Sequence, residues 1–231
     1  QTWFGTNFLA LGPAGVPGSI NGMSSSWNAF RFTQQIPALF ATTDPSVDKR
    51  ALFYTNGQNL EVNSITTSTD GYSAYKYRNK NRDGLPIGQN NNFGNLSDID
   101  FPVFRLAEIY LIYAEAVLRG GTGGSTDTAL NHINRIRGRA YADNPLSAAG
   151  NISISNLTLD FILDERAREL YWEAHRRTDL IRYNKFTTGD YLWAWKGNVE
   201  AGTAVDDKYN LFPIPTSDLL ANPNLEQIDG F

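Results

Sequence analysis

One stretch of this chain concentrates the side chains that most often do chemistry. Residues 162–186, ILDERARELYWEAHRRTDLIRYNKF, include twelve Asp, Glu, Lys, Arg and His residues among twenty-five. Paired carboxylates can serve as the acid and base of a hydrolase, and arginines can hold phosphate or carboxylate groups. The same residue types can also brace a helix, so the first question is whether this stretch is a reaction centre or a scaffold.

The apolar residues between these charges predict a helix. A stripe at helical spacing runs through Leu159, Ile162, Leu163, Ala167, Leu170, Tyr171, Ala174 and Ile181. Opposite charges lie three or four residues apart at Asp164–Arg168, Glu165–Arg168, Glu173–Arg177 and Arg176–Asp179. On an exposed face each pair contributes only about 0.2–0.5 kcal/mol, whereas buried pairs would help to specify one packing. We therefore predict an exposed scaffold helix, bent or broken near Thr178.

Other patterns of catalytic residues are weak. The chain has no cysteine and two histidines, His132 and His175, both expected within helices. His175 and Asp179 lie one turn apart, which fits a local hydrogen bond better than a catalytic dyad. No Gly-x-Ser-x-Gly elbow, phosphate loop or metal-ligand spacing occurs. We expect no catalytic residue, metal or cofactor, although two carboxylates about 5–10 Å apart would suffice for a glycoside hydrolase and the sequence leaves that open.

A pair of antiparallel helices is predicted before the charged stretch. The first begins near Pro102 and ends at Gly120–Gly121, with a stripe of Leu106, Ile109, Tyr110, Tyr113, Ala114 and Val117. The second has Thr126 or Asp127 as its N-cap and buries Ala129, Ile133, Ile136 and Ala140. Close approach of the two helices would use the small residues Ala114, Ala116, Ala129 and Ala140. Such a pair is typical of a tetratricopeptide unit, which needs neighbours to bury its faces.

The first hundred residues are rich in Gly, Asn, Ser and Thr and predict loops. Asn56–Gly57 between strand-like runs predicts a hairpin, and residues 72–78 predict a short strand with an aromatic face. Aromatic residues occur in the loop-like stretches at Trp3, Phe4, Phe8, Trp27, Phe30, Phe32, Trp193 and Trp195. Rings beside Asn, Ser and Arg suit the recognition of sugars, but they can equally fill a core between loops and helices.

Composition limits the class of partner. With 20 Lys and Arg against 24 Asp and Glu, the net charge is -4, which argues against non-specific binding of nucleic acid. No apolar run approaches about 18 residues, so no membrane-spanning segment is predicted. The chain begins at Gln1 and its one methionine is Met23. We therefore expect a piece of a longer protein.

Four segments, in this order, resemble the C-terminal half of the SusD/RagB family of outer-membrane nutrient-binding lipoproteins. They are FRLAEIYLIYAEA, ALNHINRIRGRA, ILDERARELYWEAHRRTDLIRYNKF and LFPIPTSDLLANPNLEQIDGF. The resemblance implies a mainly α fold, an α-α superhelix of tetratricopeptide-like pairs with irregular loops and a small β-hairpin. It further implies a loop-rich region with ligand-facing loops over residues 1–100. A helical region with a Pro-punctuated tail would follow over residues 101–231, both within one C-terminal unit of a longer protein.

The resemblance also implies a role. Family members bind oligosaccharides or polysaccharides without cleaving them at the outer face of the outer membrane, and deliver them to a SusC-like TonB-dependent transporter. Their lipid anchor would lie outside this chain, and nucleic acid and cofactors would play no part. The alternatives are a glycoside hydrolase with paired carboxylates, and a protein- or peptide-interaction module built on helix pairs.

Particular residues carry these expectations. Trp27 lies in a stretch that resembles a ligand-contacting loop, and the candidate glycan-binding residues are Trp3, Trp27, Asn28 and Arg31. The charged residues that match the structural signature of the family are expected to act as scaffold: Glu165, Arg166, Glu169, Glu173, Arg176, Arg177, Asp179 and Arg182.

Overall fold

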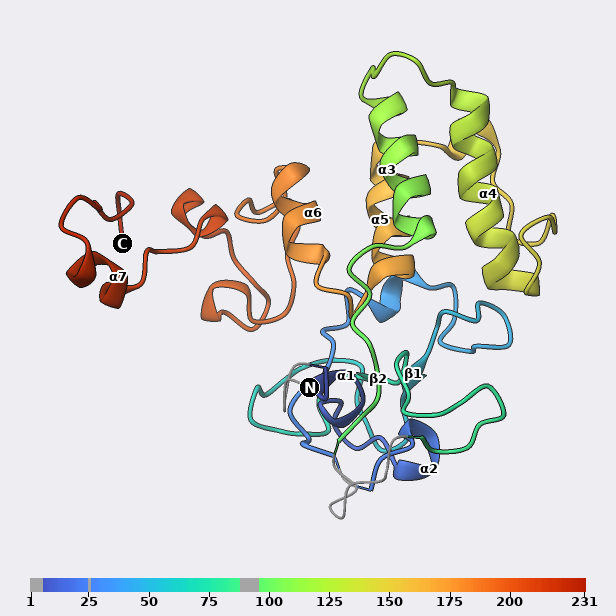
Figure 1. Cartoon of the computed structure of the whole chain (residues 1–231), viewed down its shortest axis with the longest axis horizontal. Coiled ribbons are helices and arrows are strands. Elements are labelled where there is room, and N and C mark those ends of the chain that lie inside the picture. Colours follow the sequence, from blue (N-terminus) through green and yellow to red (C-terminus); the bar gives the residue numbers. More distant parts are fainter. Residues whose placement is uncertain (1–5, 25, 88–95) are drawn as a thin grey trace. The chain divides into compact units, whose positions relative to one another are not determined.

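The computed structural model describes residues 6–24, 26–87 and 96–231 (Figure 1). The chain divides into two compact units, Gln1–Arg176 and Arg177–Phe231. Each unit is described by itself below. The predicted boundary near residue 100 falls inside the first unit. The assignment of ligand-facing loops to residues 1–100 stays a prediction.

Three helices form the core of the first unit, as Figure 1 shows. They are α3 (Leu106–Leu118), α4 (Thr126–Ala142) and α5 (Leu159–Leu170), and α3 packs against both of the others. Their shared core consists of Leu111, Ala114, Ala129, Ile133, Ile136, Leu157, Ile162 and Leu170. Helices thus dominate the regular structure of the described residues, and the predicted mainly α class with a helix pair is confirmed.

The ends of these helices differ slightly from the prediction. Ser125, not Thr126 or Asp127, is the N-cap of α4, and its hydroxyl accepts a hydrogen bond from the amide of Thr128 at 3.2 Å. Pro102 lies ahead of α3 rather than in its first turn, because the helix begins at Leu106. Arg105 occupies the N-cap position of α3 in an extended conformation and uses its side chain elsewhere.

The buried face of α3 is rotated from the predicted stripe. Leu106 and Ile109 are exposed, whereas Leu111, which the stripe omitted, is fully buried. Helices α4 and α5 both pack on α3, so the buried face is set by two neighbours and not by hydropathy alone. Ala114 is buried as expected, but Ala116 is exposed and does not mediate helix contact.

The charged stretch was predicted as a helix bent or broken near Thr178, and it forms two helices. The chain leaves α5 after Leu170 and begins α6 (Arg176–Arg182) after five intervening residues, so the break lies slightly before Thr178. Trp172 and Ala174 adopt positive φ values of 67° and 62° in this corner. The Trp172 indole donates to the carbonyl of Leu9 at 3.1 Å and packs edge-on against rings of the N-terminal loops. The turn between α5 and α6 thus contains a tryptophan with long-range contacts, and the local hydropathy pattern does not contain those contacts.

The loop-rich part contains short elements. They are α1 (Phe8–Leu11), α2 (Gly18–Asn21), η1 (Pro37–Leu39), β1 (Phe53–Tyr54) and β2 (Ser73–Ala74), with η2 (Ile154–Asn156) later in the unit. Strand β1 pairs antiparallel with β2, placing Phe53 opposite Ala74.

The prediction that the segments on either side of Asn56–Gly57 pair with each other is wrong, because β1 pairs with β2 instead. Gly57, at φ 71°, lies in a tight turn closed by the Gln58 amide on the Thr55 carbonyl, and β1 finds its partner about twenty residues later. The strand predicted over residues 72–78 shrinks to β2, both of whose residues are buried, so the expected alternation of faces does not occur.

The second unit is built from turns and short helices. After α6 come η3 (Lys196–Asn198), η4 (Asp207–Asn210) and α7 (Thr216–Ala221). The Gln227 side chain closes the tail, since it accepts from the Ile214 amide and donates to the Ile214 carbonyl, each at 3.0 Å. Among the helices of the described residues, none has the length and apolar character needed to cross a membrane.

Candidate functional site

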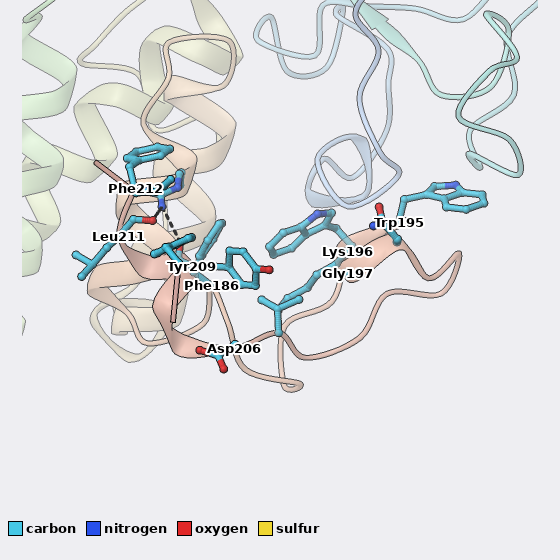
Figure 2. A pocket seen from close by; sticks show the side chains of 14 residues that line it. Phe186, Trp195, Lys196, Gly197, Asp206, Tyr209, Leu211 and Phe212 are labelled. Carbon is cyan, nitrogen blue, oxygen red and sulfur yellow. Dashed lines mark hydrogen bonds between the residues drawn. The ribbon is translucent and has the colours of Figure 1, made fainter. Parts of the chain in front are cut away.

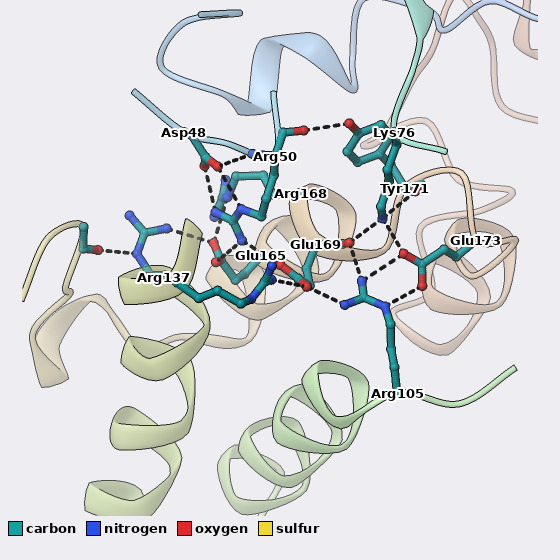
Figure 3. Close-up of polar contacts among 12 residues, drawn as sticks. Asp48, Arg50, Lys76, Arg105, Arg137, Glu165, Arg168, Glu169, Tyr171 and Glu173 are labelled. Carbon is teal, nitrogen blue, oxygen red and sulfur yellow. Dashed lines mark hydrogen bonds and ion pairs between the residues drawn. The ribbon is translucent and has the colours of Figure 1, made fainter. Parts of the chain in front are cut away.

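The carboxylates of the charged stretch are buried in the first unit, inside a network of ion pairs (Figure 3). Glu165 is 0% exposed, and Glu169 and Glu173 are each 2% exposed. Since α5 packs its charged face against loops as well as helices, partners reach these carboxylates from sequence-distant segments. The expectation of an exposed charged face is therefore wrong, and the charged residues on α5 contribute to the interior.

Glu165 is held by three arginines. Its Oε1 accepts from Arg50 at 2.8 Å, and its Oε2 accepts from Arg137 at 2.9 Å and Arg168 at 2.8 Å. Burial alone would raise the pKa of Glu165, but the charges of Arg50, Arg168 and Arg137 outweigh it and lower the pKa to about 2. The three arginines therefore favour the ionised form of Glu165.

Glu169 and Glu173 share one arginine. Arg105 donates to Glu169 Oε1 at 2.6 Å and to Glu173 Oε2 at 2.7 Å. Arg139 also donates to Glu169 Oε1, and Lys76 donates to Glu173. Glu173 was expected to pair with Arg177 and instead bonds these partners from other segments. Burial lowers the pKa of Lys76 to about 8, although Glu173 lies beside it.

The network joins the loops to the helices. Arg50, in the loop before β1, forms a bidentate pair with Asp48 at 2.9 and 2.8 Å and also reaches α5. The Tyr171 hydroxyl donates to the Arg50 carbonyl at 2.6 Å. Lys76, just after β2, donates to the Glu169 and Tyr171 carbonyls at 2.7 and 3.0 Å. Charged groups thus fix the register of three loop segments on one helix.

This arrangement opposes catalysis by the charged stretch. A hydrolase needs one carboxyl group with a raised pKa and a second one facing the substrate. Here the carboxylates accept from arginine or lysine and are closed to solvent, and the pKa values of Glu165 and Glu173 are lowered. Arg166 is buried as well, Arg176 donates to the Leu163 carbonyl, and Asp179 accepts from Arg182 at 2.8 Å. We assign these residues to the scaffold.

The two histidines contact side chains of helix α3. His132 stacks on Tyr110 with 4.2 Å between ring centroids, and burial lowers its pKa, with a smaller contribution from Arg135. The Nδ1 atom of His175 lies 3.6 Å from Glu108 Oε1. Within the described ranges, no cluster of three or more His, Cys, Asp or Glu side chains could hold a metal ion.

Trp27 lies on a surface loop that is anchored through its backbone. Its amide donates to the Leu11 carbonyl at 2.7 Å, and the amides of Ala29 and Phe30 both donate to the Gly12 carbonyl. The side chain is 42% exposed, close to the 43% exposure of Phe30. A ring held by backbone bonds at the surface can receive a ligand without first being ordered.

The polar residues near Trp27 brace loops. The Asn28 side-chain oxygen accepts from the Gly15 amide at 2.9 Å, and Asn28 itself has a positive φ of 53°. Arg31 donates to the Ile65 carbonyl at 2.9 Å. Both residues therefore join neighbouring loops, although each retains further donor groups. Trp3, the fourth candidate, lies outside the described residues.

Sequence reasoning missed Arg50, Lys76 and Arg105, which supply charges to the network from outside the charged stretch. One signal was present: the carboxylates at 165, 169 and 173 are spaced by four residues, which would place them on one face of the predicted helix beside apolar neighbours. Carboxylates buried with an apolar helix face need cationic partners, but the sequence does not show which loops supply those cations.

Comparisons with known proteins identify the relatives of this chain. A sequence model described as the SusD family matches residues 19–231. The chain is 38% identical over 188 residues to "Starch-binding protein SusD" of Bacteroides thetaiotaomicron, a match that covers 80% of this chain and 31% of that protein. It thus spans about a third of the length of this relative.

Solved structures share the fold. "Surface glycan-binding protein A" from Bacteroides fluxus superposes with a TM-score of 0.64 at 22% identity, covering 99% of this chain and 46% of that one. A SusD superfamily protein from Bacteroides vulgatus superposes with a TM-score of 0.57 at 27% identity, covering 89% of this chain and 41% of that one. The described architecture is therefore a recurrent one.

Proposed function

The chain belongs to the SusD family, and from that premise we propose that it binds oligosaccharides or polysaccharides without cleaving them. An α-glucan is the ligand we favour, because a starch-binding protein is among its relatives. In the full-length protein this binding would take place at the outer face of the bacterial outer membrane. The captured glycan would pass to a SusC-like TonB-dependent transporter.

The observation that carries the site is the exposed ring of Trp27. An indole face packs well on the C–H groups of a sugar ring, and amide and guanidinium donors nearby can bond its hydroxyls. Trp27 offers such a face on a loop tied down by the Leu11 and Gly12 carbonyls. We propose Asn28 and Arg31 as the polar helpers and Trp3 as a second ring.

The ion pairing of the carboxylates in the charged stretch supports binding without cleavage. Glu165, Glu169 and Glu173, which the sequence analysis expected to be scaffold, all form ion pairs with Arg50 or Arg105. A binding role needs no titrating pair, and the protein can keep these acids ionised for its architecture.

Calorimetric titration with maltoheptaose tests the proposal. The Trp27→Ala variant is expected to bind more weakly by about 1–3 kcal/mol, because it loses a buried aromatic contact with the sugar. The matched control is Phe104→Ala, which removes another exposed ring from the same unit and should leave the affinity unchanged.

Two results would contradict the proposal. One is full affinity in a folded Trp27→Ala variant, which would remove Trp27 from the site. The other is the release of shorter sugars from maltoheptaose on prolonged incubation, which would make the protein a hydrolase.

A further inference from the structure

A pocket of about 780 Å³ lies within the second unit. Figure 2 shows Phe186, Tyr209, Leu211 and Phe212 grouped on one side of the pocket and Trp195, Lys196 and Gly197 on the other. The two sides meet at the Phe186 and Trp193 rings, whose centroids lie 5.7 Å apart. The volume falls in the range of about 300–1,000 Å³ that is usual for small-ligand sites. All of its lining residues belong to Arg177–Phe231, so this unit forms the pocket alone.

Aromatic rings dominate both sides. Phe186, Tyr209, Phe212 and Phe231 contribute four, and Trp193 and Trp195 contribute two more. Several remain accessible, since Phe212 is 71% exposed and Tyr209 is 46% exposed. Because the Phe186 and Trp193 rings already contact each other, a flat, partly apolar ligand would stack on the exposed rings of Phe212 and Tyr209.

Cations behind the rings hold them in place. Arg177 donates to the Tyr209 carbonyl at 2.7 Å, and its guanidinium lies 4.0 Å from the Phe212 centroid and 4.9 Å from that of Phe186. On the other side, Lys196 donates to the carbonyls of residues 188 and 191 at 2.6 and 3.0 Å and lies 4.6 Å from the Trp193 centroid. Backbone carbonyls accept hydrogen bonds from both cations. The cations therefore do not need an anionic ligand as a partner.

Neutral and acidic polar groups complete the lining. They are the Asn198 side-chain amide, the Tyr209 hydroxyl and the Asp206 carboxylate, all on exposed residues. Asp206 caps η4 through one oxygen, which accepts from the Lys208 amide at 2.8 Å. Donors and acceptors of this kind beside aromatic rings match the hydroxyls around a sugar ring.

We propose that this pocket is a second carbohydrate-binding site, which takes a short neutral oligosaccharide against its exposed aromatic rings. The ligand class rests on the proposed function of the chain, whereas the site is separate from Trp27 and uses different residues. A free aromatic peptide is the rival occupant, and the Asp206, Asn198 and Tyr209 groups disfavour it because they would face apolar side chains.

Indole N–H signals in proton–nitrogen correlation spectra test the two sites separately. The chain has five tryptophans, which single Trp→Phe variants assign. During titration of the 231-residue chain with maltoheptaose, the signals of Trp193 or Trp195 should move, and they should still move in Trp27→Ala. Phe212→Ala should weaken the affinity read from these signals about tenfold, since it removes one stacking ring. Tyr209→Phe should weaken it less, because the ring remains.

The outcomes separate the two proposals. If the signal of Trp27 moves while those of Trp193 and Trp195 stay fixed with maltoheptaose, cellohexaose and xylohexaose, the second site is excluded and the proposed function stands. If Trp193 or Trp195 moves but Trp27 does not, the second site stands and the first is misplaced. Unchanged affinity in both Phe212→Ala and Tyr209→Phe would also overturn the second site.

Discussion

The two units differ in how several of their cations are bonded. In the first unit, Arg50 and Arg105 are bonded to carboxylates in the interior. In the second unit, Arg177, Lys196 and Lys208 donate to backbone carbonyls and lie against aromatic rings. The cations of both units donate hydrogen bonds, but those named in the first unit donate to carboxylates and those in the second to backbone carbonyls.

The difference separates architecture from recognition. A buried ion pair contributes little net stability against well-packed apolar groups, yet removing one member is costly, so such pairs favour a single packing. A cation behind a ring leaves the outer face of that ring accessible. The first arrangement fixes loops on α5, and the second one, like the backbone anchoring of Trp27, presents aromatic faces at a surface.

The largest expected effect comes from breaking the network at its centre. Glu165→Gln removes the charge that faces Arg50, Arg137 and Arg168. Arg50 keeps its pairs with Asp48 and Glu169, whereas Arg137 and Arg168 lose the carboxylate that they share. We expect the free energy of unfolding to fall by about 3–5 kcal/mol, measured by urea denaturation followed by far-ultraviolet circular dichroism.

The control for that measurement is Glu61→Gln. It makes the same chemical change at an exposed loop residue, where surface substitutions stay within about 0.5 kcal/mol. Equal stability of the two variants would mean that the network contributes nothing and that the contrast between the units is false.

Much of the helical core could be predicted from sequence, because local periodicity and small residues decide it. The buried stripe of α4 at Ala129, Ile133, Ile136 and Ala140 is confirmed in full. The stripe of α3 was only partly right, since two helices pack on it and the hydropathy pattern does not say from which sides. The corner at Trp172 depends on contacts with Leu9 and distant rings, which no local pattern contains.

A second prediction uses pH to test the same network. The folded-state pKa of Glu165 is lowered to about 2 from its model-compound value of 4.5, so the folded state binds the proton less tightly than the unfolded state does. The stabilisation is present above pH 4.5 and is lost as the pH falls toward 2, by about 3 kcal/mol. The pKa of Glu173 is lowered too, so its contribution adds in the same direction.

Comparison of the wild type with Glu165→Gln isolates this contribution. Urea titrations at pH 5 and at the lowest pH that keeps the protein folded should show a smaller acid loss in the variant, because it lacks the titrating group. Parallel curves for the two proteins would show that Glu165 is not the carboxylate that links stability to pH.

The candidate binding residues illustrate why sites are harder to predict than helices. Trp27 was selected because its stretch resembles a ligand-contacting loop of the family, and the structure shows it 42% exposed on a surface loop. Its role in binding stays a prediction. The pocket of the second unit could not be predicted. Its lining comes from Arg177, Phe186, the segments 193–198 and 205–213, and Phe231, and only the folded backbone brings them together.

The smallest expected effect concerns stability in the second unit. Phe212 is 71% exposed, so Phe212→Ala removes little buried area, and its stacking on Arg177 at a surface is worth about 0.5–1 kcal/mol. The free energy of unfolding should therefore fall by no more than about 1 kcal/mol, as measured by urea denaturation followed by tryptophan fluorescence. A loss near that of Glu165→Gln would mean that Phe212 serves as core. The accessible rings of the second unit would then be architecture like the carboxylates of the first.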